Sequence, residues 1–206
     1  MTVAAILLVP DIAAALADAD GEPAIRRVAH AAWSGGALPT VVVTAATDGL
    51  LLDALAGLPV VIARTEPDEP HGVAWFIHGQ RAARSAVGEA TAGLLWPVRY
   101  SWVDPETVTS LVESHGADTE RIVRPAFLGT TGFPILIPAS ADERLASSPN
   151  IPAGEAIEAL VAAGFPCHVL ELGDPGIVSD VSTPRASLPE YQGPPRPAAS
   201  APEGLR

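Results

Sequence analysis

Residues Leu94 to Thr107 read Leu-Leu-Trp-Pro-Val-Arg-Tyr-Ser-Trp-Val-Asp-Pro-Glu-Thr. They continue a short apolar run, Gly93 to Val98, which is typical of a buried strand. The Asp-Pro-Glu at 104–106 indicates a helix start, because Asp is a good N-cap, Pro suits the first helical position and Glu suits the first turn. A buried strand, a loop and a capped helix form the ligand-facing unit of open α/β sheets. We therefore expect the ligand near the loop from Arg99 to Trp102.

Strand and helix signals alternate along the rest of the chain. Apolar runs predict further strands at Val3–Val9, Thr40–Thr44, Pro59–Ala63, Ile122–Arg124, Phe133–Ile137 and Cys167–Leu172. Helical spacing and end signals predict helices over about 21–33, 48–56, 73–87, 104–115 and 153–163, and a helical turn or loop over 12–19. Gly129-Thr-Thr-Gly132 predicts a tight turn between two extended pieces, with Pro125 ending the first of them. This order predicts a three-layer α/β/α fold with a mostly parallel, doubly wound sheet and a small β-hairpin insertion.

Composition excludes several classes of partner. The 206 residues include 12 Arg, no Lys and 24 acidic residues, which gives a formal net charge of −12. Binding to nucleic acid or to an anionic membrane surface needs basic patches, so we expect neither partner. Cys167 is the only cysteine, which excludes an intrachain disulfide and a four-cysteine zinc site. No apolar run approaches the ~20 residues of a membrane span and the N-terminus lacks the basic start of a signal peptide, so we expect a cytoplasmic protein.

The composition changes near residue 189. Residues 1–188 contain all the strand and helix signals and form one predicted domain, while 189–206 are dominated by Pro, Gly, Ser and Ala. Such a segment has few core-forming residues and is typical of an unstructured tail, with a polyproline ligand for a partner as the alternative.

Several polar or aromatic groups are candidates for chemistry, each with a structural alternative. Asp180 can offer carboxylate oxygen to Mg²⁺, or it can close an Asx turn before Pro184. The turn from Gly129 to Gly132 can present backbone N–H groups to a phosphate, or it can serve only to reverse the chain. The aromatic residues at 96, 100 and 102 can line a pocket or pack on a half-buried sheet.

Motifs in the second half of the chain resemble those of the MobA-like nucleotidyltransferases. Residues 124–134, Arg-Pro-Ala-Phe-Leu-Gly-Thr-Thr-Gly-Phe-Pro, resemble the family's Pro-x-x-x-Gly-x-x-Gly-His-Pro. Residues 176–184, Gly-Ile-Val-Ser-Asp-Val-Ser-Thr-Pro, resemble its Gly-Ile-x-x-Asp-Ile-Asp-Thr-Pro, and Pro97-Val98 resembles the start of its Pro-Val-Asp-His-Pro. The resemblance covers about residues 3–188. It implies a fold like that of the nucleotide-diphospho-sugar transferases and transfer of NMP from an NTP to a small acceptor with Mg²⁺. It places Asp180 at the metal and the following residues at the ligand: Arg99, Tyr100, Gly129, Gly132 and Thr183.

The sequence departs from the family pattern where the chemistry is expected. The family's glycine-rich nucleotide loop is replaced by a shorter segment at 8–11, and its phosphate-binding Lys falls at Ala14. Its metal-binding Asp falls at Arg99, its His at Phe133 and the second Asp of its last motif at Ser182. Nucleotidyl transfer needs a divalent cation to neutralise developing charge, and an Arg at the metal position opposes one. We assign no catalytic residue from the sequence.

Two hypotheses about function follow. One is a MobA-type nucleotidyltransferase with Asp180 as its remaining metal ligand and Mg²⁺ as cofactor. The other, which the residues favour, is a non-catalytic homologue that binds a nucleotide, another small anion or a protein partner, with Arg99 as the anion-binding group. An NAD-dependent Rossmann enzyme is disfavoured because Gly-x-Gly-x-x-Gly is missing after the first strand.

Overall fold

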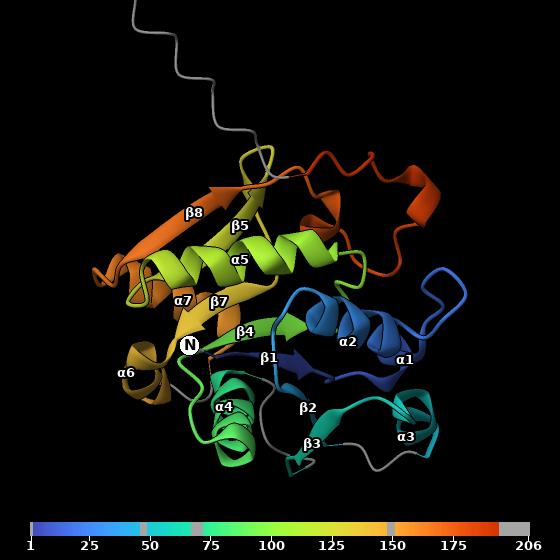
Figure 1. Cartoon of the computed structure of the whole chain (residues 1–206), viewed down its shortest axis with the longest axis horizontal. Coiled ribbons are helices and arrows are strands. Elements are labelled where there is room, and N and C mark those ends of the chain that lie inside the picture. The colour runs from blue at the N-terminus through green and yellow to red at the C-terminus, as the bar shows by residue number, and fades with distance from the viewer. Residues whose placement is uncertain (1, 46–48, 67–71, 148–150, 194–206) are drawn as a thin grey trace, which may run out of the picture.

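The computed structural model describes residues 2–45, 49–66, 72–147 and 151–193 and places eight strands in one sheet (Figure 1). The strands are β1 (Val3–Leu8), β2 (Thr40–Thr44), β3 (Val60–Arg64), β4 (Ala92–Pro97), β5 (Ile122–Phe127), β6 (Thr130–Thr131), β7 (Ile135–Pro138) and β8 (Cys167–Glu171). Their order is β3-β2-β1-β4-β7-β5-β6, with β8 paired to β5. Neighbouring strands are parallel except where β7 pairs with β4 and β5, and where β6 pairs with β5.

Helices cover both faces of this sheet. The helices are α1 (Ile12–Leu16), α2 (Ala24–Ser34), α3 (Gly49–Leu55), α4 (Val73–Val87), α5 (Pro105–Ala117), α6 (Asp142–Ala146) and α7 (Ala153–Ala162). The described chain also contains three short 3₁₀ segments: η1 (Ala139–Ala141), η2 (Pro175–Val178) and η3 (Arg185–Ser187). One apolar core packs α2, α3 and α5 against one face of the sheet, and a second packs α4, α6 and α7 against the other. The predicted three-layer α/β fold with a mostly parallel sheet is therefore confirmed.

Strand β1 sets the edge of the sheet at which we expect a ligand. All six residues of this strand are buried, and it pairs in parallel with β2 on one side and β4 on the other. The register places Leu8 opposite both Val43 and Pro97, so these three strands end at one level. Because the carboxyl ends of parallel strands meet at one edge, the residues after β1 and β4 lie side by side there.

The predicted hairpin insertion is present, but its turn was placed too late in the sequence: the chain reverses at Leu128 and Gly129, and Thr130–Thr131, predicted as part of the turn, form β6, which pairs with β5. The predicted end of the first strand was also wrong, because β5 continues through Pro125 to Phe127. Proline lacks an N–H donor, yet the Pro125 carbonyl still accepts from the Gly132 N–H at 2.9 Å. The loss of one donor therefore did not end the strand.

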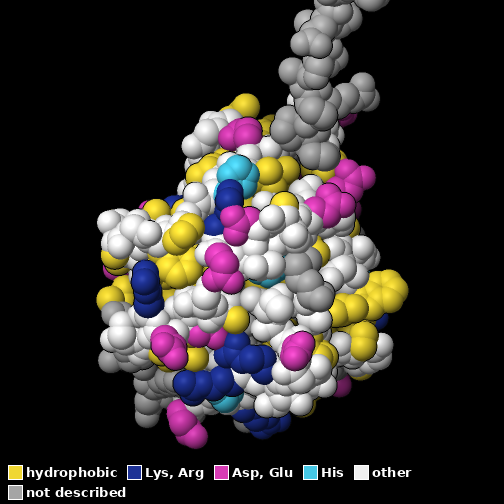
Figure 2. All heavy atoms as spheres, turned by 60° about the vertical axis from the view of Figure 1, so that its left-hand side comes forward, with side chains coloured by type: hydrophobic (Ala, Val, Ile, Leu, Met, Phe, Trp, Pro, Cys, Tyr) yellow, Lys and Arg dark blue, Asp and Glu magenta, His cyan; other side chains and the backbone are white. Residues whose placement is uncertain are grey.

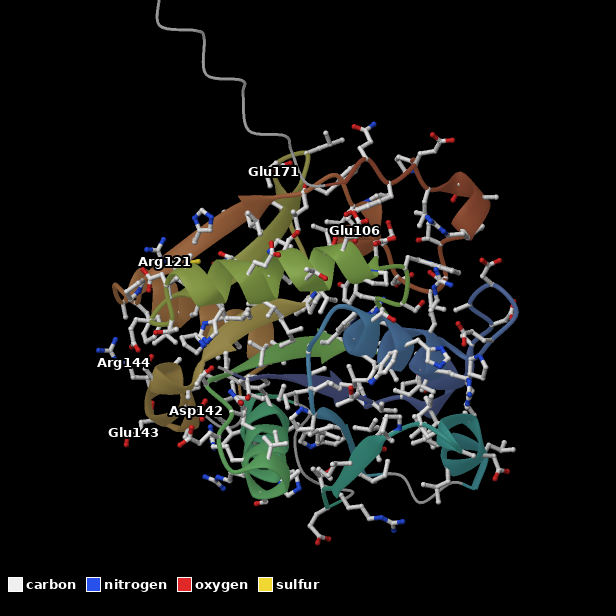
Figure 3. All side chains as sticks on the ribbon, in the orientation of Figure 1. Glu106, Arg121, Asp142, Glu143, Arg144 and Glu171 are labelled. Carbon is white, nitrogen blue, oxygen red and sulfur yellow. The ribbon has the colours of Figure 1, made fainter. Side chains whose placement is uncertain are left out.

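The C-terminal segment is packed on the domain as far as Gly193. Gly173 and Gly193 share a backbone hydrogen bond of 3.1 Å, and the Gln192 N–H donates to Gly173 at 3.0 Å. The Tyr191 hydroxyl contacts Glu106 Oε2 at 3.1 Å, near the start of α5 where Figure 3 labels Glu106. Residues 189–193 of the predicted tail are thus held against the domain, and residues 194–206 lie outside the described residues.

The molecular surface mixes charges of both signs. Figure 2 shows Arg side chains interspersed with acidic ones on the face that it displays. Among the described helices, none combines the length and the apolar character that a membrane crossing requires.

Candidate functional site

A pocket of about 360 Å³ opens at the carboxyl ends of β1 and β4. It is lined by Pro10, Asp11, Ala14, Pro97, Val98, Arg99, Asp180, Val181 and Ser182. Three segments that are distant in sequence therefore meet here: the turn after β1, the loop after β4 and the late loop around residue 181. This is the crevice in which open α/β sheets bind their ligands.

Backbone contacts join the loop after β4 to the late loop. The Val181 N–H donates to the Arg99 carbonyl at 2.7 Å. The indole N–H of Trp102 donates to the Asp180 carbonyl at 3.0 Å, and that of Trp96 donates to the Tyr100 carbonyl at 2.9 Å. Trp96 and Trp102 are both buried, so these two indoles pack and hold the loop instead of lining the pocket. The structural alternative foreseen for them is correct.

Arg99 and Asp180 form an ion pair inside the pocket, between Arg99 Nη2 and Asp180 Oδ2. The Arg99 side chain is 58% exposed and that of Asp180 is 22% exposed. Hydrogen bonds from the Ser182 hydroxyl and from Arg99 lower the pKa of Asp180 below its ordinary value. The hydrogen bond to Asp180 raises the pKa of Arg99, so both groups are charged at neutral pH.

Asp180 also closes a turn, as the structural alternative for this residue foresaw. Its Oδ1 accepts from the Ser182 N–H at 3.0 Å and from the Ser182 hydroxyl, while Oδ2 accepts from Arg99. Both carboxylate oxygens therefore already have donors. The carboxylate fixes the position of the Arg99 guanidinium in the pocket.

The side chains at this site do not form a set of ligands that fits a divalent cation. Mg²⁺ requires several oxygen ligands, and the guanidinium of Arg99 occupies the coordination space of Asp180 and repels a cation. Asp11 is the other carboxylate of the pocket, and its Oδ1 accepts from the Ala13 N–H at 2.9 Å. Within the described ranges, no three His, Cys, Asp or Glu side chains come close enough to hold a metal ion.

Asp174 fixes the framework behind the pocket. This side chain is only 2% exposed and accepts three hydrogen bonds, from the Asp104 N–H at 2.9 Å, the Thr107 hydroxyl at 2.7 Å and the Gly176 N–H at 2.8 Å. Burial raises its pKa above the ordinary value despite these donors. The carboxylate thus ties the start of α5 to η2, and it thereby supports the loop that ends in Trp102.

The other residues that the resemblance implies at the ligand lie outside the lining of this pocket. The Tyr100 ring packs against that of Phe133 in a tilted arrangement, with ring centroids 4.8 Å apart. The Thr183 N–H donates to the Asp180 carbonyl at 2.9 Å, within the turn that Asp180 closes. Both glycines lie at the β5–β6 hairpin: the Gly129 N–H donates to Glu171 Oε1 at 3.2 Å, and a β-carbon on Gly132 would overlap the Ile177 carbonyl.

Sequence reasoning missed Asp11 and Val181 as lining residues and Asp174 as a support. Asp11 had a usable signal, because it follows a buried strand and therefore lies at the carboxyl edge of the sheet. A second, apolar pocket of about 180 Å³ lies next to the first and shares Pro10 and Pro97 with it. It is lined by Leu8, Pro10, Trp75, Leu95, Pro97, Phe133, Ala153 and Gly154.

Several solved structures, among them a nucleotidyl transferase, share this fold. Mth528, a nucleotidyl transferase from Methanothermobacter thermautotroptrophicus, aligns with a TM-score of 0.73 at 20% identity, over 86% of this chain and 91% of its own. Rv0371c from Mycobacterium tuberculosis H37Rv, solved with manganese, aligns with a TM-score of 0.66 at 15% identity, over 84% of this chain and 89% of its own. CMP:2-keto-3-deoxy-manno-octonic acid synthetase, solved with CTP, aligns with a TM-score of 0.64 at 13% identity, over 84% of this chain and 90% of its own. No family model and no curated protein matches the sequence.

Proposed function

We propose that this protein is a non-catalytic relative of the MobA-like nucleotidyltransferases that binds a nucleotide or another small anionic ligand beside Arg99, without a metal ion. The observation that carries this proposal is the ion pair of Arg99 with Asp180 inside the pocket. A guanidinium stands where the family pattern has a metal-binding carboxylate. It supplies the positive charge that a metal would otherwise bring, in a fixed position.

Arg99 has donors left for such a ligand. A guanidinium carries five N–H donors, and the ion pair with Asp180 uses Nη2. Within the described part of the chain, the remaining donors on Nη1 and Nε have no hydrogen-bond partner. A carboxylate or phosphate at the pocket mouth can accept from these groups while the ion pair stays intact.

Transfer chemistry lacks the groups that it needs. Stabilisation of a transferring phosphoryl group requires cations aimed at its oxygens. The pocket offers one guanidinium, already paired with a carboxylate, and neither Lys nor a fitting set of metal ligands. Binding without turnover is therefore the function that the site supports best.

Calorimetric titration tests this proposal. ATP, GTP and CTP, their monophosphates and simple carboxylic acids are titrated into the protein, once in buffer with MgCl₂ and once in buffer with EDTA. An assay for pyrophosphate release runs in parallel. We expect binding of at least one anion that EDTA does not weaken, no pyrophosphate release, and loss of this binding in Arg99→Asp. Arg81→Asp is the matched control, because Arg81 is exposed on α4 and lies outside the pocket. Mg²⁺-dependent nucleotide binding with turnover would overturn the proposal.

A further inference from the structure

The charges in the pocket beside Arg99 oppose a polyanion. Arg99 and Asp180 neutralise each other, and Asp11 adds a further carboxylate to the same lining. The lining therefore carries a net negative formal charge, on a chain whose net charge is −12. A triphosphate would meet one guanidinium that is already paired and two carboxylates that repel it.

Two lining residues of opposite sign, Arg99 and Asp11, keep polar atoms that make no hydrogen bond within the described residues. Arg99 keeps the donors on Nη1 and Nε, as described above. Asp11 is exposed, and its Oδ1 accepts from the Ala13 N–H at 2.9 Å. Among the described residues no donor reaches the second oxygen of Asp11. Asp180 differs, because each of its oxygens already accepts at least one hydrogen bond.

The remaining walls of the pocket are apolar. Pro10, Ala14, Pro97, Val98 and Val181 lie among the charged residues of the lining. A volume of about 360 Å³ is near the lower end of the ~300–1,000 Å³ typical of small-molecule sites. The pocket therefore suits a small molecule with one anionic group, one cationic group and an apolar body.

We propose that the ligand class of this pocket is a small zwitterion of the α-amino-acid type, whose carboxylate accepts from Arg99, whose ammonium donates to Asp11 and whose apolar part lies along the proline and valine walls. This inference rests on the proposed function and narrows it. In this arrangement every charge has a partner of opposite sign, whereas a simple anion leaves Asp11 unpaired beside it.

A matched series of probes tests the inference by calorimetry. Each of five apolar amino acids (alanine, valine, leucine, methionine and phenylalanine) is compared with its carboxylic acid lacking the amino group and its amine lacking the carboxylate; for leucine these are 4-methylpentanoate and 3-methylbutylamine. We expect at least one amino acid to bind at least tenfold more tightly than both of its truncated forms.

Two variants separate the contributions of the two charges. Asp11→Asn keeps the cap of α1, because its amide oxygen can still accept from the Ala13 N–H. This variant should reduce the affinity for the amino acid to that for the carboxylic acid lacking the amino group. Arg99→Gln should reduce the affinity for the amino acid to that for the amine lacking the carboxylate. Asp53→Asn, an exposed site on α3 outside the pocket, is the control and should change neither affinity.

Several results would overturn the inference: no amino acid in the series binds, the acids or nucleoside monophosphates bind as tightly as the amino acids, or Asp11→Asn leaves amino-acid binding unchanged. Arg99-dependent binding of simple anions in those cases would leave the proposed function standing. Turnover of nucleotide with Mg²⁺ would instead remove the proposed function itself, so the two failures are distinguishable.

Discussion

Removal of the buried Asp174 carboxylate should destabilise the fold through the loss of three identified hydrogen bonds. Asp174→Ala leaves three groups without their acceptor: the Asp104 N–H, the Thr107 hydroxyl and the Gly176 N–H. A buried donor left unpaired costs about 1–3 kcal/mol. The Asp104 N–H is only partly buried and the Thr107 hydroxyl can rotate, so the loss corresponds to about two such donors. Relief of the desolvation that raises the pKa of Asp174 offsets part of it. We therefore expect Asp174→Ala to lower the free energy of unfolding by about 3 kcal/mol.

Asp174→Asn separates the loss of charge from the loss of an acceptor. The amide oxygen keeps the bond from the Gly176 N–H, and the amide nitrogen can donate to the Thr107 oxygen after that hydroxyl rotates. The Asp104 N–H then stands alone without its acceptor, which predicts a loss of about 1–2 kcal/mol. The pair of variants should therefore rank alanine as clearly more destabilising than asparagine.

Urea denaturation followed by circular dichroism measures both variants at pH 7. The raised pKa of Asp174 adds a signature: between its ordinary value of 3.8 and the raised value, the folded state holds the proton more tightly. The wild type should lose stability as pH rises through that window, and Asp174→Asn should lack this loss. An alanine variant within 1 kcal/mol of wild type, or an asparagine variant as unstable as alanine, would refute the reasoning.

Three further outcomes follow from individual residues. Burial lowers the pKa of His115, so the unfolded chain takes up a proton first as pH falls below 6.5; stability should fall there in wild type and stay flatter in His115→Gln, as measured by thermal melts across pH 5–8. Gly132→Ala should cost more than ~2 kcal/mol in urea denaturation, because its β-carbon overlaps the Ile177 carbonyl, whereas Gly154→Ala, in a helix with open space around it, should be neutral or stabilising by up to ~1 kcal/mol. Arg99→Gln should change the free energy of unfolding by less than ~1 kcal/mol, because the Arg99 side chain is 58% exposed, yet it should abolish anion binding in calorimetry.

The elements that sequence reasoning placed well are those with long or sharply bounded apolar patterns. The predicted strand Thr40–Thr44 and the predicted helix Val73–Val87 coincide with β2 and α4. The helix α6 and the strand β6 were missed, because segments of five and two residues are too short to show a period. Their existence depends on tertiary contacts that the local sequence does not contain.

The meeting of Arg99 and Asp180 at this edge of the sheet was predictable from the sequence, but most of the pocket lining was not. The strand-loop-helix pattern at 93–107 and the resemblance together pointed to the edge where Arg99 and Asp180 meet, although these residues lie 81 positions apart. Asp174 gave no such signal, because its donors belong to α5 and η2 and become neighbours only after folding. Of the other ligand residues implied by the resemblance, Tyr100 lies in the loop after β4, and the two glycines and Thr183 lie in the hairpin and in the turn near 183; all four are outside the pocket lining.

The pairing of positions 99 and 180 depends on the backbone and not on their side chains. The Val181 N–H binds the Arg99 carbonyl, the Trp102 indole binds the Asp180 carbonyl, and Gly176 lies so close to Trp102 that any β-carbon would overlap its carbonyl. These contacts persist whatever side chain stands at 99. With an Asp there, two carboxylates would face each other, an arrangement that a cation between them or a shared proton would stabilise. With Arg99, the same geometry satisfies Asp180 internally, because the protein itself supplies the positive charge beside that carboxylate.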